Sequence, residues 1–189
     1  MSETKPDKQR AILDAALVLF AERGFHGAPT SLIAERAGVG VGTIYRYFKD
    51  KDALIHAVFH ELHASAHARI FADYPREQPI RERFILLFTR LLRWFIAEPQ
   101  EFRFMEQYHY SPYAFAGEPQ FPEESEIIRQ LLAEARSQQI IKDAPMPVLE
   151  SIAFGPIVAL AKEHISGRQP VDDNLVRLTV DACWDGLKR

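Results

Sequence analysis

Apolar residues recur along most of this chain at intervals of three and four, the spacing of amphipathic helices. Over residues 7–23 they form one stripe, which Gly24 is expected to end. The same periodicity continues to the end of the chain, and no segment shows the strict alternation of a half-buried strand. The sequence therefore predicts an all-α fold. The later helices are expected over about 51–71, 80–97, 99–110, 123–139, 147–166 and 173–187.

Two short helices joined by a glycine-rich turn are predicted within residues 32–51, LIAERAGVGVGTIYRYFKDK. The first begins near Pro29, because proline suits the first helical position, where its missing N–H costs nothing. Gly38 ends it, since glycine readily takes the left-handed conformation of a helix end. Gly40 can cap the second helix, although Ser, Thr, Asp or Asn would do so better.

The second helix of this pair has two unlike faces. At about 100° per residue, one face is apolar and carries Val41, Ile44 and Phe48. The opposite face is polar and carries Gly42, Arg46 and Lys49, with Thr43, Tyr45 and Tyr47 beside it. Such an outer face is expected of a helix that reads DNA, and Gly42 would let the backbone approach the duplex closely.

The segments RAILDAALVLFAERGF at 10–25 and IAERAGVGVGTIYRYFKDKDAL at 33–54 resemble the amino-terminal domain of TetR/AcrR family transcriptional regulators. The resemblance implies a helix-turn-helix DNA-binding domain over 1–52 and a connecting helix at about 51–71. It also implies a helical effector-binding and dimerisation domain over 72–189. In that family the last two helices pair with those of a second subunit, so a homodimer is expected.

DNA contacts are assigned to the predicted helix pair and its flanks. Arg46 and Thr43 would read base edges, because arginine can bind guanine with two hydrogen bonds. Phosphates would be held by hydroxyl and basic side chains, and in the family early basic residues, here Lys5 and Lys8, can also touch them. The predicted DNA-binding residues are Thr30, Ser31, Val41, Gly42, Thr43, Tyr45, Arg46, Tyr47 and Lys51.

The glycine-rich turn allows other interpretations. A dinucleotide-binding loop needs a preceding strand and a later third glycine, whereas here the preceding segment is helical and position 43 is threonine. A plain helical hairpin would not require the outward Arg46 and paired tyrosines. A helical module that binds only protein remains the alternative to a DNA reader. No recognisable motif places a nucleophile beside a base, so the chain is not expected to be an enzyme.

An aromatic segment follows the strongly apolar helix at 80–97. It contains Phe102, Phe104, Met105, Tyr108, His109, Tyr110, Tyr113 and Phe115. Such residues suit the wall of a pocket for an apolar or aromatic effector, although ordinary core packing or an interface accounts for most aromatic clusters. The predicted ligand-binding residues are Phe88, Trp94, Phe102, Met105, Tyr108, His109 and Tyr113.

Four histidines share one stripe of the helix at 51–71: His56, His60, His63 and His67. Pairs at this spacing can bind zinc or nickel, so a metal-responsive regulator is a second alternative. A partly solvated helix face, or a surface that responds to pH, explains the stripe without a metal. No metal or cofactor is assigned.

Composition adds few constraints. The chain has 189 residues and a net charge of −3. It can therefore bind nucleic acid only if its basic residues are gathered on one surface. Its single cysteine, Cys183, fits a reducing compartment, and the polar start MSETKPDK is unlike a signal peptide. We expect a soluble, cytoplasmic, sequence-specific regulator that does not span a membrane. Repression of transcription, relieved by a small apolar or aromatic effector, is the mode that the resemblance implies.

Overall fold

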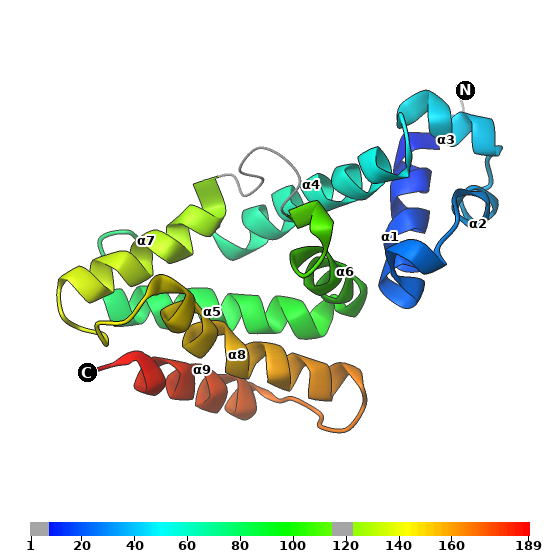
Figure 1. Ribbon diagram of the computed structural model, residues 1–189. Coiled ribbons are helices and arrows are strands. Elements are labelled where there is room, and N and C mark those ends of the chain that lie inside the picture. The colour runs from blue at the N-terminus through cyan, green and yellow to red at the C-terminus, as the bar shows by residue number, and fades with distance from the viewer. Residues whose placement is uncertain (1–7, 115–122) are drawn as a thin grey trace, which may run out of the picture. The chain divides into compact units, whose positions relative to one another are not determined.

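The computed structural model describes residues 8–114 and 123–189, with the side chains of 123–126 excepted. Across that part of the chain, nine α-helices and one 3-10 helix follow one another (Figure 1), which confirms the all-α prediction. They are α1 Lys8–Gly27, α2 Thr30–Arg36, α3 Val41–Tyr47, α4 Lys51–Ile70, α5 Ile80–Ala97, α6 Pro99–His109, η1 Pro112–Ala114, α7 Glu123–Ser137, α8 Met146–Ile165 and α9 Asp173–Leu187. None of these helices is long and apolar enough to cross a membrane.

The chain forms two compact units. The first is drawn from residues 1–65 and 100–118, and the second from 66–99 and 119–189. By packing, α6 therefore belongs with the amino-terminal helices, although it follows α5 in sequence. The division into a DNA-binding domain at 1–52 and an effector domain at 72–189 is a division by function, and it stays a proposal.

The first unit is built around aromatic rings from α1, α4 and α6. Phe104 of α6 lies edge-on to Phe25, with ring centroids 5.6 Å apart, and Tyr108 stacks on Phe59 of α4 at 4.0 Å. Phe59, Phe104 and Tyr108 are fully buried. Burying a large aromatic side chain is among the strongest stabilising contributions available to a small domain. These rings therefore fix α6 and α4 within the unit that carries the glycine-rich turn.

Helix ends in the first unit follow local sequence signals. Gly24 interrupts α1 with a φ of 73°, at the position where the sequence predicts the helix end. Asp50 caps α4 by accepting a hydrogen bond from the Ala53 N–H at 2.8 Å. Ala28, which precedes Pro29, is fully buried in the core. Pro29 is then the residue before the first turn of α2, with no side-chain cap.

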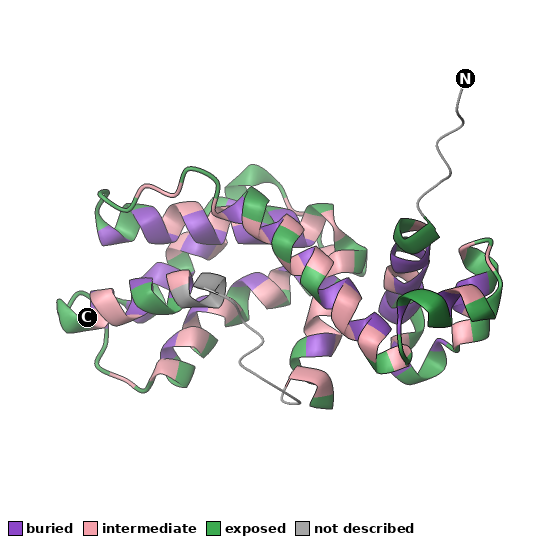
Figure 2. Ribbon diagram, turned by 90° about the horizontal axis from the view of Figure 1, so that it is seen from above, coloured by how far each residue is buried: buried purple, intermediate pink, exposed green. Residues whose placement is uncertain are grey.

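The second unit packs around α5, whose apolar residues are buried against α7, α8 and α9. Phe84 and Phe88 of α5 stack with centroids 4.1 Å apart, and Phe84 also lies 5.3 Å from the Trp184 ring. Buried positions recur at regular intervals along the helices (Figure 2), as expected for amphipathic helices that share a core. The strongly apolar helix at 80–97 therefore lies at the centre of its unit.

Candidate functional site

The turn between α2 and α3 fixes the angle of the second helix. Gly38 has a φ of +66°, a conformation that glycine takes without strain. The Val39 N–H donates to the Ala34 carbonyl at 3.0 Å, which satisfies a carbonyl at the end of α2. Ile33 of α2 and Ile44 of α3 are both buried, with exposures of 0% and 1%. The turn and these two side chains therefore hold α2 and α3 as one rigid hairpin.

The outer face of α3 presents most of the predicted DNA-binding residues to solvent. Gly42 and Arg46 are exposed, Tyr45 and Tyr47 are 51% and 41% exposed, and Thr43 is half-buried. Val41 was placed on the buried face by its periodicity, and this is wrong, since it is 39% exposed. The first helical residue lies before the point where α3 meets the core, so only Ile44 and Phe48 are buried. Val41 instead joins the outer face.

Gly42 has no structural requirement inside the protein. Its φ is not positive, and a Cβ added to it would meet no atom within 4 Å. Glycine in a helix costs about 0.5–1 kcal/mol relative to alanine. The residue therefore lowers helix stability with no packing benefit within the described chain, which favours a role in close approach to a partner outside it.

Substituting Gly42→Ala should separate folding from DNA binding. We expect the free energy of unfolding to rise by about 0.5–1 kcal/mol, because alanine favours the helix. Operator affinity should fall by roughly fivefold, because the added methyl group holds the backbone away from the duplex and weakens about one hydrogen bond. Urea unfolding and fluorescence anisotropy with labelled DNA measure the two effects. Unchanged affinity would show that Gly42 is not at the interface.

Some of the predicted phosphate contacts come from residues before and after α3 in the sequence. The Thr30 hydroxyl at the start of α2 lies 3.3 Å from the Tyr45 hydroxyl, within hydrogen-bond distance. This places two predicted phosphate contacts side by side, and Ser31 is exposed next to them. The Lys51 ammonium lies 5.9 Å from the Phe20 ring centroid, and burial lowers its pKa against the opposing effect of Asp52. Of the two early lysines, Lys8 is exposed and Lys5 lies outside the described residues.

Hydrogen bonds tie α6 and η1 to α4. His56 Nδ1 lies 2.9 Å from the Tyr108 hydroxyl, and the Tyr113 hydroxyl donates to Asp52 at 3.0 Å. Burial raises the pKa of Tyr108 to about 12, so its hydroxyl stays protonated at neutral pH. His56 thus has a structural partner in the first unit, and the α4 segment next to the helix pair is bound once to α6 and once to η1.

The remaining histidines of the stripe also have aromatic neighbours. The His60 and His63 rings each lie 5.5 Å from the Phe59 ring, and His67 stacks on Phe71 at 5.0 Å. Within the part of the chain that the structure describes, no group of three or more His, Cys, Asp or Glu side chains could hold a metal ion. The stripe has the features of a partly covered helix face.

The predicted ligand-binding residues are distributed over both units. Met105, Tyr108 and Tyr113 come together in the core of the first unit, whereas Phe88 is buried between Phe84 and Phe154 in the second. Phe102 is buried and His109 is exposed, while Phe115 of the same aromatic segment lies outside the described residues. Their roles in binding an effector stay predictions. Core packing is the contact that the structure shows for most of them.

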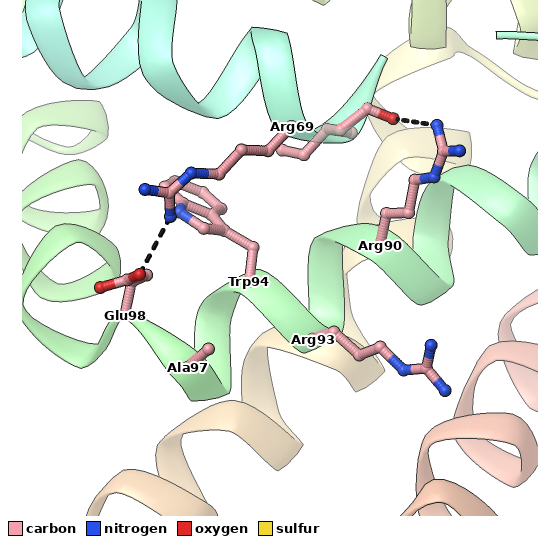
Figure 3. Close-up of a pocket in the computed structure, with 7 residues that line it drawn as sticks. Arg69, Arg90, Arg93, Trp94, Ala97 and Glu98 are labelled. Atoms are coloured by element: carbon pink, nitrogen blue, oxygen red, sulfur yellow. Dashed lines mark hydrogen bonds and ion pairs between the residues drawn. The ribbon is translucent and has the colours of Figure 1, made fainter. Parts of the chain in front are cut away.

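Trp94 lines an open pocket of about 280 Å³ in the second unit. Arg69 and Arg90 border this pocket (Figure 3), and their guanidinium groups have protein partners. Arg69 is paired with Glu98 at 2.9 Å, and Arg90 donates to the Ile70 carbonyl at 2.9 Å. The pocket therefore combines an apolar indole with two arginine side chains that already have partners, Glu98 just after α5 and the Ile70 carbonyl at the end of α4.

The sequence reading missed a second pocket, which is lined by the buried Arg83. The available signal was the position of Arg83 on the apolar face of α5, one turn after Ile80 and one turn before Leu87. An arginine on a buried stripe needs polar partners, so it marks a possible site.

Comparisons with known proteins decide the family. Residues 12–58 match the family described as bacterial regulatory proteins, tetR family, and residues 79–188 match the domain described as tetracyclin repressor-like, C-terminal domain. The chain belongs to the TetR family. The family resemblance and the order of domains are thereby confirmed. Members are DNA-binding transcriptional regulators and not enzymes, which also agrees with the sequence analysis.

Curated relatives match over part of this chain. The fatty acid metabolism regulator protein of Bacillus subtilis is 34% identical over 90 residues, which are 48% of this chain and 46% of the relative. The transcriptional repressor KstR of Mycolicibacterium smegmatis is 41% identical over 54 residues, 29% of this chain and 26% of that one. The matched segments thus span less than half the length of these relatives.

Solved structures extend the similarity to nearly the whole chain. A TetR family regulator from Marinobacter aquaeolei VT8 has a TM-score of 0.81 at 25% identity, covering 96% of both chains. A putative TetR family regulator from Vibrio parahaemolyticus has a TM-score of 0.77 at 27% identity and covers 97% of this chain and 100% of that one. The regulator FadR from Bacillus subtilis in complex with stearoyl-CoA shares the fold, with a TM-score of 0.67 at 23% identity over 92% of this chain and 95% of that one.

Proposed function

We propose that this TetR-family regulator is a repressor that binds a twofold-symmetric operator and leaves it when a small effector with an apolar part binds. The observation that carries the proposal is the outer face of α3. It exposes Arg46, Tyr45 and Tyr47 around Gly42, whose Cβ position is open. Arg46 and Thr43 would read base edges, while Thr30, Ser31, Tyr45, Tyr47 and Lys51 would hold phosphates.

An exposed face of α8 and α9 suits dimerisation and so supports this proposal. These two helices leave an apolar, small-residue face exposed in the protomer, at Gly155, Pro156, Ala159, Leu178, Ala182 and Gly186. Leu178, the largest of these side chains, is 61% exposed. Exposed apolar faces of this kind are typical of interfaces, and two copies can cover each other about a twofold axis. A dimer also allows two short reading helices to engage half-sites one or more helical turns apart.

The effector proposed here is a long-chain acyl-CoA. The names of similar proteins suggest this chemistry: a Bacillus subtilis relative is a fatty acid metabolism regulator, and FadR from the same organism was solved in complex with stearoyl-CoA. Apolar and aromatic side chains are abundant in the carboxy-terminal helices, as a binding site for an acyl chain would need. The effector would release the operator by binding more tightly to a conformation in which the two DNA-binding heads no longer match the half-site spacing.

A titration of the operator complex tests this function. Fluorescence anisotropy with the promoter region of the chain's own gene should show a complex that stearoyl-CoA weakens about 5- to 150-fold, the usual range for linked sites. Free coenzyme A is the control, and it should have a much smaller effect. A DNA complex that stearoyl-CoA leaves unchanged would remove this effector while keeping the regulator. No complex at any protein concentration would instead favour the alternative of a module that binds only protein.

A further inference from the structure

A polar pocket of about 240 Å³ lies in the second unit, apart from the outer face of α3. Its lining residues come from the α4–α5 connection, α5 and α7: Tyr74, Arg76, Arg83, Ile127, Gln130, Leu131 and Glu134. The Arg83 side chain is only 8% exposed, although it lies on α5 among apolar neighbours. A charged group so deeply buried requires compensation from its surroundings.

Glu134 of α7 supplies only part of that compensation. Its carboxylate accepts a hydrogen bond from Arg83 Nη2 at 2.8 Å, while Arg83 Nε is buried without a protein partner. The Tyr74 hydroxyl is likewise buried without one. Among the described side chains, these two atoms are the buried nitrogen or oxygen atoms left unsatisfied, and both belong to this one pocket. Buried polar groups without partners are rare and costly, so the coincidence calls for a ligand.

Both orphaned groups are hydrogen-bond donors. Burial raises the pKa of Tyr74, so its hydroxyl keeps its proton at neutral pH. For Arg83, burial has the largest single effect and lowers the pKa of the guanidinium. The hydrogen bond with Glu134 and the interaction with Tyr74 together outweigh the effect of burial, so the pKa of Arg83 is raised. Arg83 and Tyr74 are thus near neighbours, yet neither orphaned atom has hydrogen-bond geometry to the other. An acceptor oxygen between them would satisfy both.

The charge around the pocket favours an anion. Two arginines face one glutamate among the lining residues, which leaves an excess of one positive charge. Arg76 is exposed and can reach a bound group from the outside. The volume suits a small organic anion, or one charged group of a larger molecule, more closely than a long apolar chain.

We propose that this pocket binds an anionic oxygen group, a carboxylate or a phosphate, through Arg83 Nε and the Tyr74 hydroxyl, with Arg76 at its entrance. The site goes beyond the proposed function, because it requires neither operator binding nor an acyl chain. The competing explanation is that Arg83 serves only to tie α5 to α7 through Glu134. That explanation leaves the two orphaned donors unexplained and predicts no response to anions.

Thermal unfolding and calorimetry at constant ionic strength test the site with acetate, propionate and inorganic phosphate, against chloride as the reference. We expect at least one of these anions to raise the melting temperature and to bind with measurable heat. A response to acetate or propionate but not to phosphate would identify the bound group as a carboxylate, and the reverse response would identify it as a phosphate. A response no larger than that of chloride for all three would overturn the proposal.

Tyr74→Phe is the decisive variant, because it removes a hydroxyl that has no hydrogen-bond partner in the protein and keeps the aromatic ring. The free variant should melt at an unchanged or higher temperature, since an unsatisfied hydroxyl is gone, while anion affinity falls about tenfold. Arg76→Gln should weaken binding by a smaller factor. Arg81→Gln, which removes the same charge from the first turn of α5 but breaks only a pair with Asp181, should leave binding unchanged. Full anion affinity in Tyr74→Phe would overturn the assignment. Operator binding is measured separately, and neither result decides the other.

Discussion

Arg46→Ala is expected to lower operator affinity by about 5- to 150-fold and to remove the preference for one base at each half-site. The range corresponds to the 1–3 kcal/mol of discrimination that a two-pronged arginine contact to guanine provides. Arg46 is exposed on α3, and no hydrogen bond or ion pair within the described chain engages its guanidinium. The substitution should therefore leave the melting temperature unchanged.

Anisotropy titrations with the operator and with single-base variants of it measure this effect. Arg46→Lys is the matched variant, because lysine keeps the charge but cannot form the planar two-pronged contact. We expect it to retain most of the salt-dependent affinity and to lose the base preference. If Arg46→Ala bound the operator and its variants as the unaltered protein does, the reading face would lie elsewhere.

Leu178→Glu is expected to convert the dimer to a monomer and to weaken operator binding by a factor of about 100 or more. In the protomer Leu178 is largely exposed, so the change should leave the fold intact. In a dimer through α8 and α9, two carboxylates would be brought into an apolar interface, which is strongly unfavourable. A monomer loses the advantage of linked half-site binding, which commonly contributes a factor of 10² to 10⁴.

Sedimentation velocity and anisotropy on the same preparations measure the two consequences. Tyr110→Glu introduces the same charge at another exposed large side chain, 80% exposed and in the first unit, and should change neither property. A Leu178→Glu protein that remains dimeric would place the interface outside the α8–α9 face.

Helix positions were largely predictable because their signals are local. The helices at 80–97 and 173–187 have the predicted bounds, since their apolar stripes run from end to end and stop at clear boundaries. The α2–α3 turn was equally readable from Gly38, which has the predicted left-handed conformation. Periodicity and turn chemistry act over a few residues, so one sequence suffices to recognise them.

Packing partners could not be predicted in the same way. The spacing of Phe104 and Tyr108 shows that one side of α6 is buried, but it does not say which helix covers it. The structure places both in the core of the first unit, with Tyr108 bonded to His56, a residue 52 positions earlier. Arg83 illustrates the same limit. Its place on an apolar stripe marks it as unusual. Its hydrogen-bond partner Glu134 and its pocket neighbour Tyr74 lie on other elements and come near it only once the chain is folded.

Footprinting of the purified chain on the promoter region of its own gene tests most directly that it reads DNA as a twofold dimer through α3. We expect two protected half-sites of related, inverted sequence, with centres one or more helical turns of about 10 to 10.5 base pairs apart. Both should disappear together in Arg46→Ala. Protection of a single unsymmetrical site, or no protection at concentrations where the protein is dimeric, would contradict it.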